Sequence, residues 1–514
     1  MTETCDPKTS NLGFDPDALH ARYLAERDKR LRPDGLEQYV PLQGRFAQYA
    51  DDPYAPKDFS RPPLTDSVDV AVIGGGFSGL ITAGKLRQAW VQDIRIIEMG
   101  SDFGGTWYWN RYPGIRCDVE SYIYMPFLEE LGYIPTEKYA GGDEIRAHCQ
   151  AIGRHFDLYS NACLQTKVTS IEWNDQAARW VIRTNRGDDM KARFVCLGGG
   201  IMHRPKLPGI PGIEGFQGEA FHTSRWNYAF TGGDANGNLT GLKGKRVAII
   251  GTGATAIQCV PRLAEYAEHL FVFQRTPSTV DNRNNRPTDA AWAASLEPGW
   301  QQERMVNFTT IVSGLPHDKD LVNDRWTDVW GRLWTMDSVQ EGIDPAELMQ
   351  LADYQKMEDI RRRIDEIVTD RSTAESLKPW YNLFCKRPLY SDEYLQAFNQ
   401  PNVTLVDTQG RGVERITPKG LVFGGTECEV DCIIYATGFT VGVPPHEAGD
   451  YQVLGRDGET LSEHWKKECR SIHGLITRGF PNLFVQGHLC QATLAVNVPH
   501  GLAAQATGVS GVPV

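Results

Sequence analysis

The sequence predicts an α/β protein with two Rossmann-like dinucleotide-binding domains and a helical insertion. Two short apolar runs, at 68–73 and 247–250, are each followed by a glycine-rich turn and then by a helix-like segment. A strand, a glycine-rich turn and a helix in this order are the context in which such glycines bind a dinucleotide. Residues 285–380 instead show helical spacing with few β-branched runs, which indicates a separate helical region.

Composition and charge narrow the class of protein. The chain has 514 residues, of which 41% are hydrophobic and 23% charged, as in an ordinary globular protein. Its net charge of −12 argues against a general nucleic-acid binder. No uncharged apolar run reaches about 18 residues, so we expect no membrane-spanning helix, and no secretory signal is visible. The eleven cysteines lack a CxxC pair, which argues against a zinc finger and favours reduced thiols in a cytoplasmic, metal-free protein.

The chain divides into an N-terminal extension, residues 1–65, and three further regions. Within the extension, Asp15 and Pro16 predict the start of a helix that ends before Pro33. Residues 66–202 and 432–514 are expected to form the first dinucleotide-binding domain, residues 203–280 and 381–431 the second, and residues 281–380 the helical insertion. The tryptophan stripe that begins at Trp326 is expected to be core. We interpret a basic cluster in the extension as a solvated helix face: Arg22, Arg27, Lys29, Arg30 and Arg32.

The first glycine-rich turn is typical of a pyrophosphate site. Gly74, Gly76 and Gly79, with Ser78 between the last two, follow the pattern GxGxxG, in which glycines permit a tight turn and a close approach of the phosphates. Glu98 stands 19 residues beyond Gly79. A carboxylate there accepts hydrogen bonds from the ribose hydroxyls and repels a 2′-phosphate, so this site is expected to hold FAD or NAD. The alternative is that the glycines serve only a structural turn.

The second turn has the same pattern with a different residue downstream. Its members are Gly251, Thr252, Gly253, Ala254, Thr255 and Ala256. Arg275, followed by Thr276, stands 19 residues beyond Ala256. A guanidinium suits the 2′-phosphate of NADPH, although an ordinary exposed arginine is the alternative. Two dinucleotides on one chain imply hydride transfer between them, which indicates a flavin-dependent oxidoreductase fed by NADPH.

Four further segments share the motifs of one family. The first is GGTWYWNRYPGIRCD at 104–118, and the second is Phe216-x-Gly218-x-x-x-His222-x-x-x-Trp226, which is followed by Asn227 where the family often has Pro or Asp. The others are KRP at 386–388 and ATGF at 436–439. Over about residues 66–500 the chain resembles the class B flavoprotein Baeyer–Villiger monooxygenases, whose fingerprint is FxGxxxHxxxW. The extension is similar to that of members acting on large cyclic and polycyclic ketones.

The resemblance implies a reaction that uses FAD and NADPH to insert one oxygen atom of O2 next to a ketone carbonyl, which gives an ester or lactone. It further implies that the reaction passes through a C4a-peroxyflavin and that NADP+ stays bound after hydride transfer. It assigns catalysis to Arg387, a fixed cation beside the developing oxyanion, and to Asp118, which holds that guanidinium. The alternatives are that Arg387 is an ordinary surface arginine and that Asp118 forms only a structural ion pair. Lys386 is implied to join Arg275 at the 2′-phosphate. The remaining implied cofactor contacts, beside Arg387 and Asp118 themselves, are Thr106, Trp107, Trp109, Arg116, Tyr124 and Val168.

Two rival functions stay open. A flavin N- or S-oxygenase would use the same cofactors, although Trp226 and the segment 104–118 argue against it. A redox sensor would bind both dinucleotides without turnover. His222 is either a residue of the hinge between domains or a packed, hydrogen-bonded histidine. We expect a monomer that acts on a small-molecule ketone, and little core packing from the Gly- and Ala-rich stretch 501–514.

Overall fold

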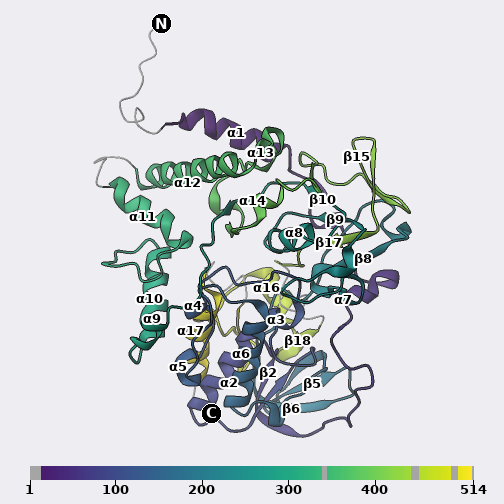
Figure 1. Cartoon of the computed structure of the whole chain (residues 1–514). Helices are drawn as coiled ribbons and strands as arrows, with labels where there is room; N and C mark the ends of the chain where they lie inside the picture. Colours follow the sequence, from purple (N-terminus) through teal and green to yellow (C-terminus); the bar gives the residue numbers. More distant parts are fainter. Residues whose placement is uncertain (1–12, 338–343, 442–450, 488–495, 512–514) are drawn as a thin grey trace.

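Two α/β units and a helical region make up the chain (Figure 1). The computed structural model describes residues 13–337, 344–441, 451–487 and 496–511. In Figure 1 the first unit lies in the lower half of the view, the second unit lies at the upper right, and the helical region runs down the left side. Within the described residues, no helix is both long and apolar enough to cross a membrane.

The first unit is built on a seven-stranded mixed sheet. Its order is β18-β4-β5-β6-β2-β3, and β19 pairs with β6. The strands are β2 (Ser67–Ile73), β3 (Ile94–Ile97), β4 (Val168–Asn174), β5 (Arg179–Thr184), β6 (Asp189–Leu197), β18 (Gln452–Leu454) and β19 (Leu483–Val485). β2 is parallel to both of its neighbours and is buried along almost its whole length, as a strand covered on both faces must be. The glycine-rich turn after β2 leads into α2 (Phe77–Gln88).

The second unit contains a five-stranded parallel sheet in the order β13-β10-β9-β17-β8. Its strands are β8 (Glu219–His222), β9 (Arg246–Ile250), β10 (His269–Gln274), β13 (Val403–Asp407) and β17 (Cys432–Tyr435). The small antiparallel sheet β14 (Arg415–Ile416), β15 (Gly420–Phe423) and β16 (Thr426–Glu429) precedes β17.

The position of β17 corrects the expected domain boundary at residue 432. Residues 432–435 were expected in the first domain, but β17 lies between β8 and β9 of the second sheet, and all four of its residues are buried. An apolar run of four residues indicates a central parallel strand, but it does not say which of two parallel sheets receives it. The second unit therefore extends at least to Tyr435.

Five α-helices form the helical region: α9 (Ala290–Ala294), α10 (Trp300–Val312), α11 (Arg325–Asp337), α12 (Pro345–Ile367) and α13 (Arg371–Leu377). Asp344 caps α12, because its side chain accepts a hydrogen bond from the amide of Ala346 at 2.8 Å. Met357, Ile360 and Ile364 of α12 belong to the same buried cluster as Val247 and Ile249 of β9. The helical region is thus packed onto the second unit.

The N-terminal extension runs along both units. Its helix α1 (Pro16–Asp28) begins after the cap Asp15, as predicted from the sequence, and packs against α12 at the top of Figure 1. β1 (Tyr39–Val40) pairs with β7 (Leu207–Pro208). Further along, Arg61 forms an ion pair at 2.6 Å with Asp188 of the first unit.

The C-terminal stretch contributes more core than the sequence suggested. Residues 498–510 form the helix α17 (Val498–Ser510), which packs against α2. Leu502, Ala506 and Val509 are buried in the same cluster as Leu80 and Ala83 of α2. The expectation of little packing was wrong because small side chains allow two helices to approach closely, so a few apolar residues suffice to bury the contact.

Candidate active site

The first glycine-rich turn joins β2 to α2 with almost no free space. Gly74 has φ +108°, and a Cβ at this position would lie 2.8 Å from the carbonyl oxygen of Gly198. A Cβ at Gly79 would lie 1.9 Å from the carbonyl oxygen of Gly74. Only glycine fits either position. Gly76 precedes α2 without a side-chain cap, so the first amides of α2 are available to an anion.

Glu98 lies against this turn, where the sequence placed it. Its carboxylate accepts hydrogen bonds from the amides of Gly75 at 2.5 Å and Gly100 at 2.6 Å. Burial raises the pKa of Glu98 above its usual value, although both amides favour the anion. Ser78, in the first turn of α2, lies with its hydroxyl 3.3 Å from the side-chain oxygen of Gln486.

A second segment of the first unit closes on the same turn. Gly105 has φ +53°, and a Cβ there would lie 2.6 Å from the Cα of Gly76. This contact places α3 (Thr106–Trp109) beside the glycine-rich turn. The rings of Trp107 and Tyr124 meet edge to face at 5.8 Å. The Nε1 of Trp107 is buried and has no hydrogen-bond partner among the described residues, so it is a donor that a bound cofactor could satisfy.

Three other predicted contacts have partners within the protein. Trp109 is buried with the guanidinium of Arg225 4.4 Å from its ring centre. Arg116 forms an ion pair with Glu137 and donates to the carbonyl oxygen of Tyr139 at 3.1 Å. Val168 is buried at the start of β4. The side chains of these three residues therefore serve packing and ion pairing.

The second glycine-rich turn is equally tight on one side and open on the other. Gly251 has φ +114°, and a Cβ there would lie 2.4 Å from the carbonyl oxygen of Ala436, which brings the ATGF segment against the turn. A Cβ at Gly253 would meet nothing within 4 Å. Thr252 donates to the carbonyl oxygen of Thr276 at 3.0 Å. Ala254 and Thr255 complete the turn before α8 (Ala256–Ala264), whose first residue is buried.

Arg275 and Lys386 come together at the end of β10, although they are far apart in the sequence. A side-chain nitrogen of Arg275 donates to Gln38 of the extension at 2.6 Å. Burial lowers the pKa of Lys386 to about 8, and the charges of Arg275 and Arg30 contribute further. The two neighbouring guanidinium groups thus disfavour the charged form of Lys386 in addition to its desolvation.

The neighbouring residue, Arg387, forms a two-point ion pair with Asp118. Its Nε and Nη2 donate to the two carboxylate oxygens at 2.6 and 2.8 Å, across 269 positions of sequence. Burial alone would raise the pKa of Asp118, but the charge and hydrogen bonds of Arg387 lower it, and Asp118 in turn raises the pKa of Arg387. The Arg387 side chain as a whole keeps 43% of its surface exposed.

The helical region and the start of the insertion support this ion pair. Trp326 of α11 donates from Nε1 to the carbonyl oxygen of Asp118 at 2.7 Å, and its ring lies 5.0 Å from the Arg387 guanidinium. Arg283 is buried, and its charge also lowers the pKa of Asp118. Sequence reasoning assigned Trp326 to the core and did not single out Arg283. No spacing in the sequence relates either residue to Asp118, so only the fold reveals these contacts.

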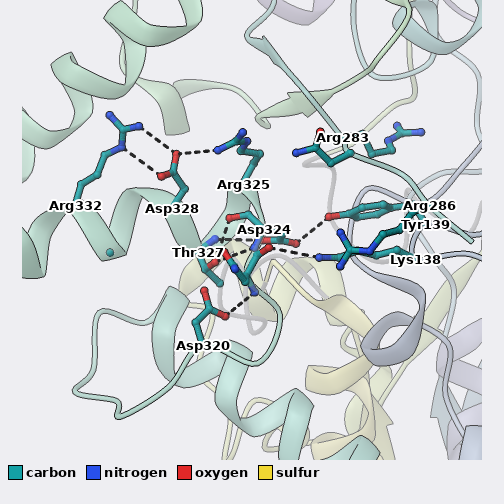
Figure 2. A pocket seen from close by; sticks show the side chains of 13 residues that line it. Lys138, Tyr139, Arg283, Arg286, Asp320, Asp324, Arg325, Thr327, Asp328 and Arg332 are labelled. Carbon is teal, nitrogen blue, oxygen red and sulfur yellow. Dashed lines mark hydrogen bonds and ion pairs between the residues drawn. The ribbon is translucent and has the colours of Figure 1, made fainter. Parts of the chain in front are cut away.

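A polar cavity of about 590 Å³ opens beside Arg283 (Figure 2). Figure 2 shows Asp328 facing Arg325 and Arg332, and Asp324 facing Tyr139, whose hydroxyl is 3.3 Å away. Burial raises the pKa of Asp324 to about 6, with a further contribution from the charge of Glu120. The cavity is therefore lined by charges that largely compensate one another.

His222 is a packed histidine. It is fully buried at the end of β8, and its ring nitrogens lie 2.9 Å from the hydroxyl of Ser224 and 3.0 Å from the carbonyl oxygen of Gly438. Burial lowers its pKa to about 3, and the charge of Arg225 lowers it further. A histidine that is neutral at every working pH is not suited to proton transfer near neutrality.

Comparisons with known proteins agree with this arrangement. A model of the NAD(P)-binding Rossmann-like domain matches residues 72–131. Neopentalenolactone D synthase of Streptomyces avermitilis is 54% identical over 96% of this chain and 84% of its own. A Baeyer–Villiger monooxygenase of Streptomyces coelicolor is 49% identical over 94% of this chain and 81% of its own.

Solved structures agree as well. A polycyclic ketone monooxygenase from the fungus Thermothelomyces thermophila superimposes with a TM-score of 0.89 and 39% identity, over 96% of this chain and 84% of that one. A complex of OTEMO with FAD and NADP superimposes with a TM-score of 0.72 and 28% identity, over 88% of this chain and 85% of that one. The sequence resemblance, the two dinucleotide-type turns and the full-length similarity lead to one conclusion: the chain belongs to the Baeyer–Villiger monooxygenase family.

Proposed function

We propose that this protein uses FAD, NADPH and O2 to insert one oxygen atom next to the carbonyl of a bulky cyclic ketone, forming a lactone or ester. The observation that carries the proposal is the Arg387–Asp118 ion pair. Tyr124, whose ring meets Phe77 of the first glycine-rich turn at 5.5 Å, is among the groups whose charge acts on Arg387. Lys386, which precedes Arg387 in the chain, is near Arg275 of the second site.

FAD fits the first unit. The amides of the turn Gly74–Gly79 and the first turn of α2, with Ser78, would hold its pyrophosphate. Glu98 would accept the ribose hydroxyls, and Thr106, Trp107 and Tyr124 would line the flavin, with the free Nε1 of Trp107 available to it. When bound, FAD supplies the chemistry that takes hydride from NADPH and activates O2. The similar structure that holds FAD and NADP supports both assignments.

NADPH fits the second unit. The turn from Gly251 to Ala256 would hold its pyrophosphate, with open space beside Gly253. Arg275 and Lys386 would bind the 2′-phosphate, which carries close to two negative charges at neutral pH. We accordingly assign residues 66–202, with those from 451 onward, to FAD binding, and residues 203–280 and 381–435 to NADPH binding.

Arg387 would act on the ketone as a permanent cation. When an oxygen nucleophile adds to the carbonyl carbon, the carbonyl oxygen becomes negatively charged, and a fixed guanidinium stabilises that charge without releasing a proton. Asp118 positions the guanidinium, and Trp326 fixes the backbone of Asp118. An electrophilic N- or S-oxygenation would create no such oxyanion, and so would not require the pair.

Similarity to a polycyclic ketone monooxygenase supports a large cyclic ketone as the substrate. Both dinucleotide sites and the ion pair are built from a single chain, which supports a monomer as the working unit. Eight cysteines in the described part of the chain, Cys469 not counted, are free thiols, in keeping with a reducing compartment such as the cytoplasm.

The product of the reaction tests the proposal. The purified, FAD-loaded protein is incubated with NADPH, air and a bulky cyclic ketone, and the products are analysed by mass spectrometry beside an assay for hydrogen peroxide. We expect a lactone heavier than the ketone by one oxygen atom, labelled when ¹⁸O2 is supplied. Oxygenation of amines or sulfides without any lactone would refute the proposal in favour of an N- or S-oxygenase, and bound cofactors without any product from a panel of ketones would favour a sensor.

A further inference from the structure

Arg30 of the N-terminal extension lies next to the residues assigned to the 2′-phosphate. The chain leaves α1 through Lys29 and Arg30 and packs on Gly410, which has φ +87°. A Cβ at Gly410 would lie 2.7 Å from the carbonyl oxygen of Lys29 and 3.0 Å from the Cγ of Arg30. The amide of Gly410 donates to the carbonyl oxygen of Arg275 at 3.1 Å. Gly410 thus contacts both the residues that follow α1 and the backbone of Arg275.

The Arg30 side chain is held in place before any ligand arrives. Its Nη1 donates to the carboxylate of Glu26 at 2.5 Å and to the carbonyl oxygen of Glu26 at 2.7 Å. Only 19% of the side chain is exposed, and its Nε is buried without a hydrogen-bond partner in the described residues. A buried and unsatisfied guanidinium nitrogen is costly unless something binds it.

The charge around Arg30 is not balanced. The positive charges of Arg275 and Arg30 both contribute to the lowered pKa of Lys386. Arg30 also contributes to the electrostatic surroundings of Tyr381, whose ring lies 5.6 Å from the Lys386 ammonium. Glu26 compensates part of this charge but is shared with Lys29, whose ammonium lies 2.7 Å away. An anion with two negative charges and several acceptor oxygens matches such a cluster.

We propose that Arg30 is a third cation of the 2′-phosphate site, so that the N-terminal extension selects NADPH over NADH together with Arg275 and Lys386. The proposal rests on the function proposed above. It also changes the interpretation of the basic cluster, because one of its five members faces a site of the second unit and not only solvent. The ligand chemistry is that of a phosphomonoester on the 2′-oxygen of an adenosine.

Equilibrium binding to the FAD-loaded protein tests this role without turnover. The probes are 2′,5′-ADP and 5′-AMP, with dissociation constants measured by calorimetry. We expect Arg30→Gln to weaken 2′,5′-ADP about three- to tenfold, as removal of one partly exposed charge from a phosphate site does, and to leave 5′-AMP unchanged. Arg27→Gln is the matched control: Arg27 stands in the last turn of α1, three residues before Arg30, is 59% exposed and pairs with Asp28, so its loss should change neither constant.

A further variant separates binding from a structural role of the ion pair. Glu26→Gln removes the same pair but leaves the Arg30 charge, so 2′,5′-ADP should bind as well as before or more tightly. Equal weakening by Glu26→Gln and Arg30→Gln would mean that the pair only supports the fold, and would overturn the proposal. Selective weakening of 2′,5′-ADP by Arg275→Ala but not by Arg30→Gln would overturn the role of Arg30 alone. No selectivity loss in either variant would instead refute the NADPH site itself.

Discussion

Lys386 and Arg387 are neighbours in the sequence, but the fold gives them opposite electrostatic surroundings. Arg387 meets the carboxylate of Asp118 through two hydrogen bonds, and its pKa is raised. Lys386 lies near the cations Arg275 and Arg30, and desolvation together with their charges lowers its pKa to about 8. One cation is already paired, whereas the other adds to an excess of charge of its own sign.

This difference separates two tasks that both need positive charge. A cation that stabilises a transient oxyanion must stay fixed and protonated in every cycle, which a permanent partner such as Asp118 secures. A cation that binds a phosphate gains most when its surroundings lack an anion, because the ligand then supplies the missing charge. In the function proposed here, Arg387 therefore serves the chemistry and its neighbour Lys386 serves cofactor selection.

The largest effect is expected when the paired cation is removed. Arg387→Ala should lower lactone formation about 10²- to 10³-fold, because an oxyanion then forms without its charged partner. Flavin reduction by NADPH should persist, since hydride transfer does not use this guanidinium. Stopped-flow absorbance and product analysis measure the two steps. Lys386→Ala is the comparison, with the reverse pattern of weakened NADPH binding and retained lactone yield at saturating NADPH; equal patterns in the two variants would contradict the division of tasks.

Replacement of Asp118, the partner of Arg387, should lower lactone formation less than replacement of Arg387 itself. Asp118→Asn keeps the shape of the side chain but leaves Arg387 with a neutral neighbour, so the guanidinium loses its fixed direction. We expect lactone formation to fall about 10- to 100-fold, as for the loss of hydrogen bonds to a charged group, and peroxide release to rise. An unchanged ratio of lactone to peroxide would show that Asp118 does not position Arg387.

Much of the fold could be predicted because its signals are local. Gly74 and Gly251 follow apolar strands, and their positive φ angles and close contacts demand glycine, so pattern and structure agree. β17 could not be assigned, because a four-residue apolar run suits either parallel sheet and its pairing depends on distant strands. The packing of α17 was missed because its buried residues Leu502, Ala506 and Val509, although at helical spacing, stand among many Gly and Ala residues and form only a weak apolar pattern.

Less of the site could be predicted from residues alone. The family motifs identified Asp118 and Arg387 as a pair, and the structure brings their side chains together. Trp326 is a core residue, as predicted, but its hydrogen bond to Asp118, 208 positions away, was not predicted. Arg30 was assigned to a solvated face, because its proposed role depends on residues more than 200 positions away. Such contacts depend on how the helical region and the extension pack, which no local spacing encodes.

The unpaired cation should make NADPH binding depend on pH. In its proposed role Lys386 would bind the 2′-phosphate when protonated, and its pKa of about 8 in the free protein means that it loses its proton as pH rises from 7 to 9. We expect the dissociation constant of NADPH to increase up to about tenfold per pH unit above 8, the limit for uptake of one proton on binding. NADH binding should stay constant over this range. Lys386→Met should remove the dependence, and a slope that survives in this variant would assign the titration to another group.

The smallest effect is expected at Trp326, which supports the paired cation from the helical region. Trp326→Phe keeps an aromatic face beside Arg387 but removes the hydrogen bond from Nε1 to the carbonyl oxygen of Asp118. One neutral hydrogen bond is worth about 0.5–1.5 kcal/mol, so kcat for lactone formation should fall about two- to tenfold while the KM for NADPH stays the same. Trp330→Phe is the matched control, because Trp330 stands one turn along α11 and stacks on Phe384. If both variants lowered kcat equally, the effect would come from the packing of α11. A fall confined to Trp326→Phe would show that the helical insertion helps to position the Arg387–Asp118 pair.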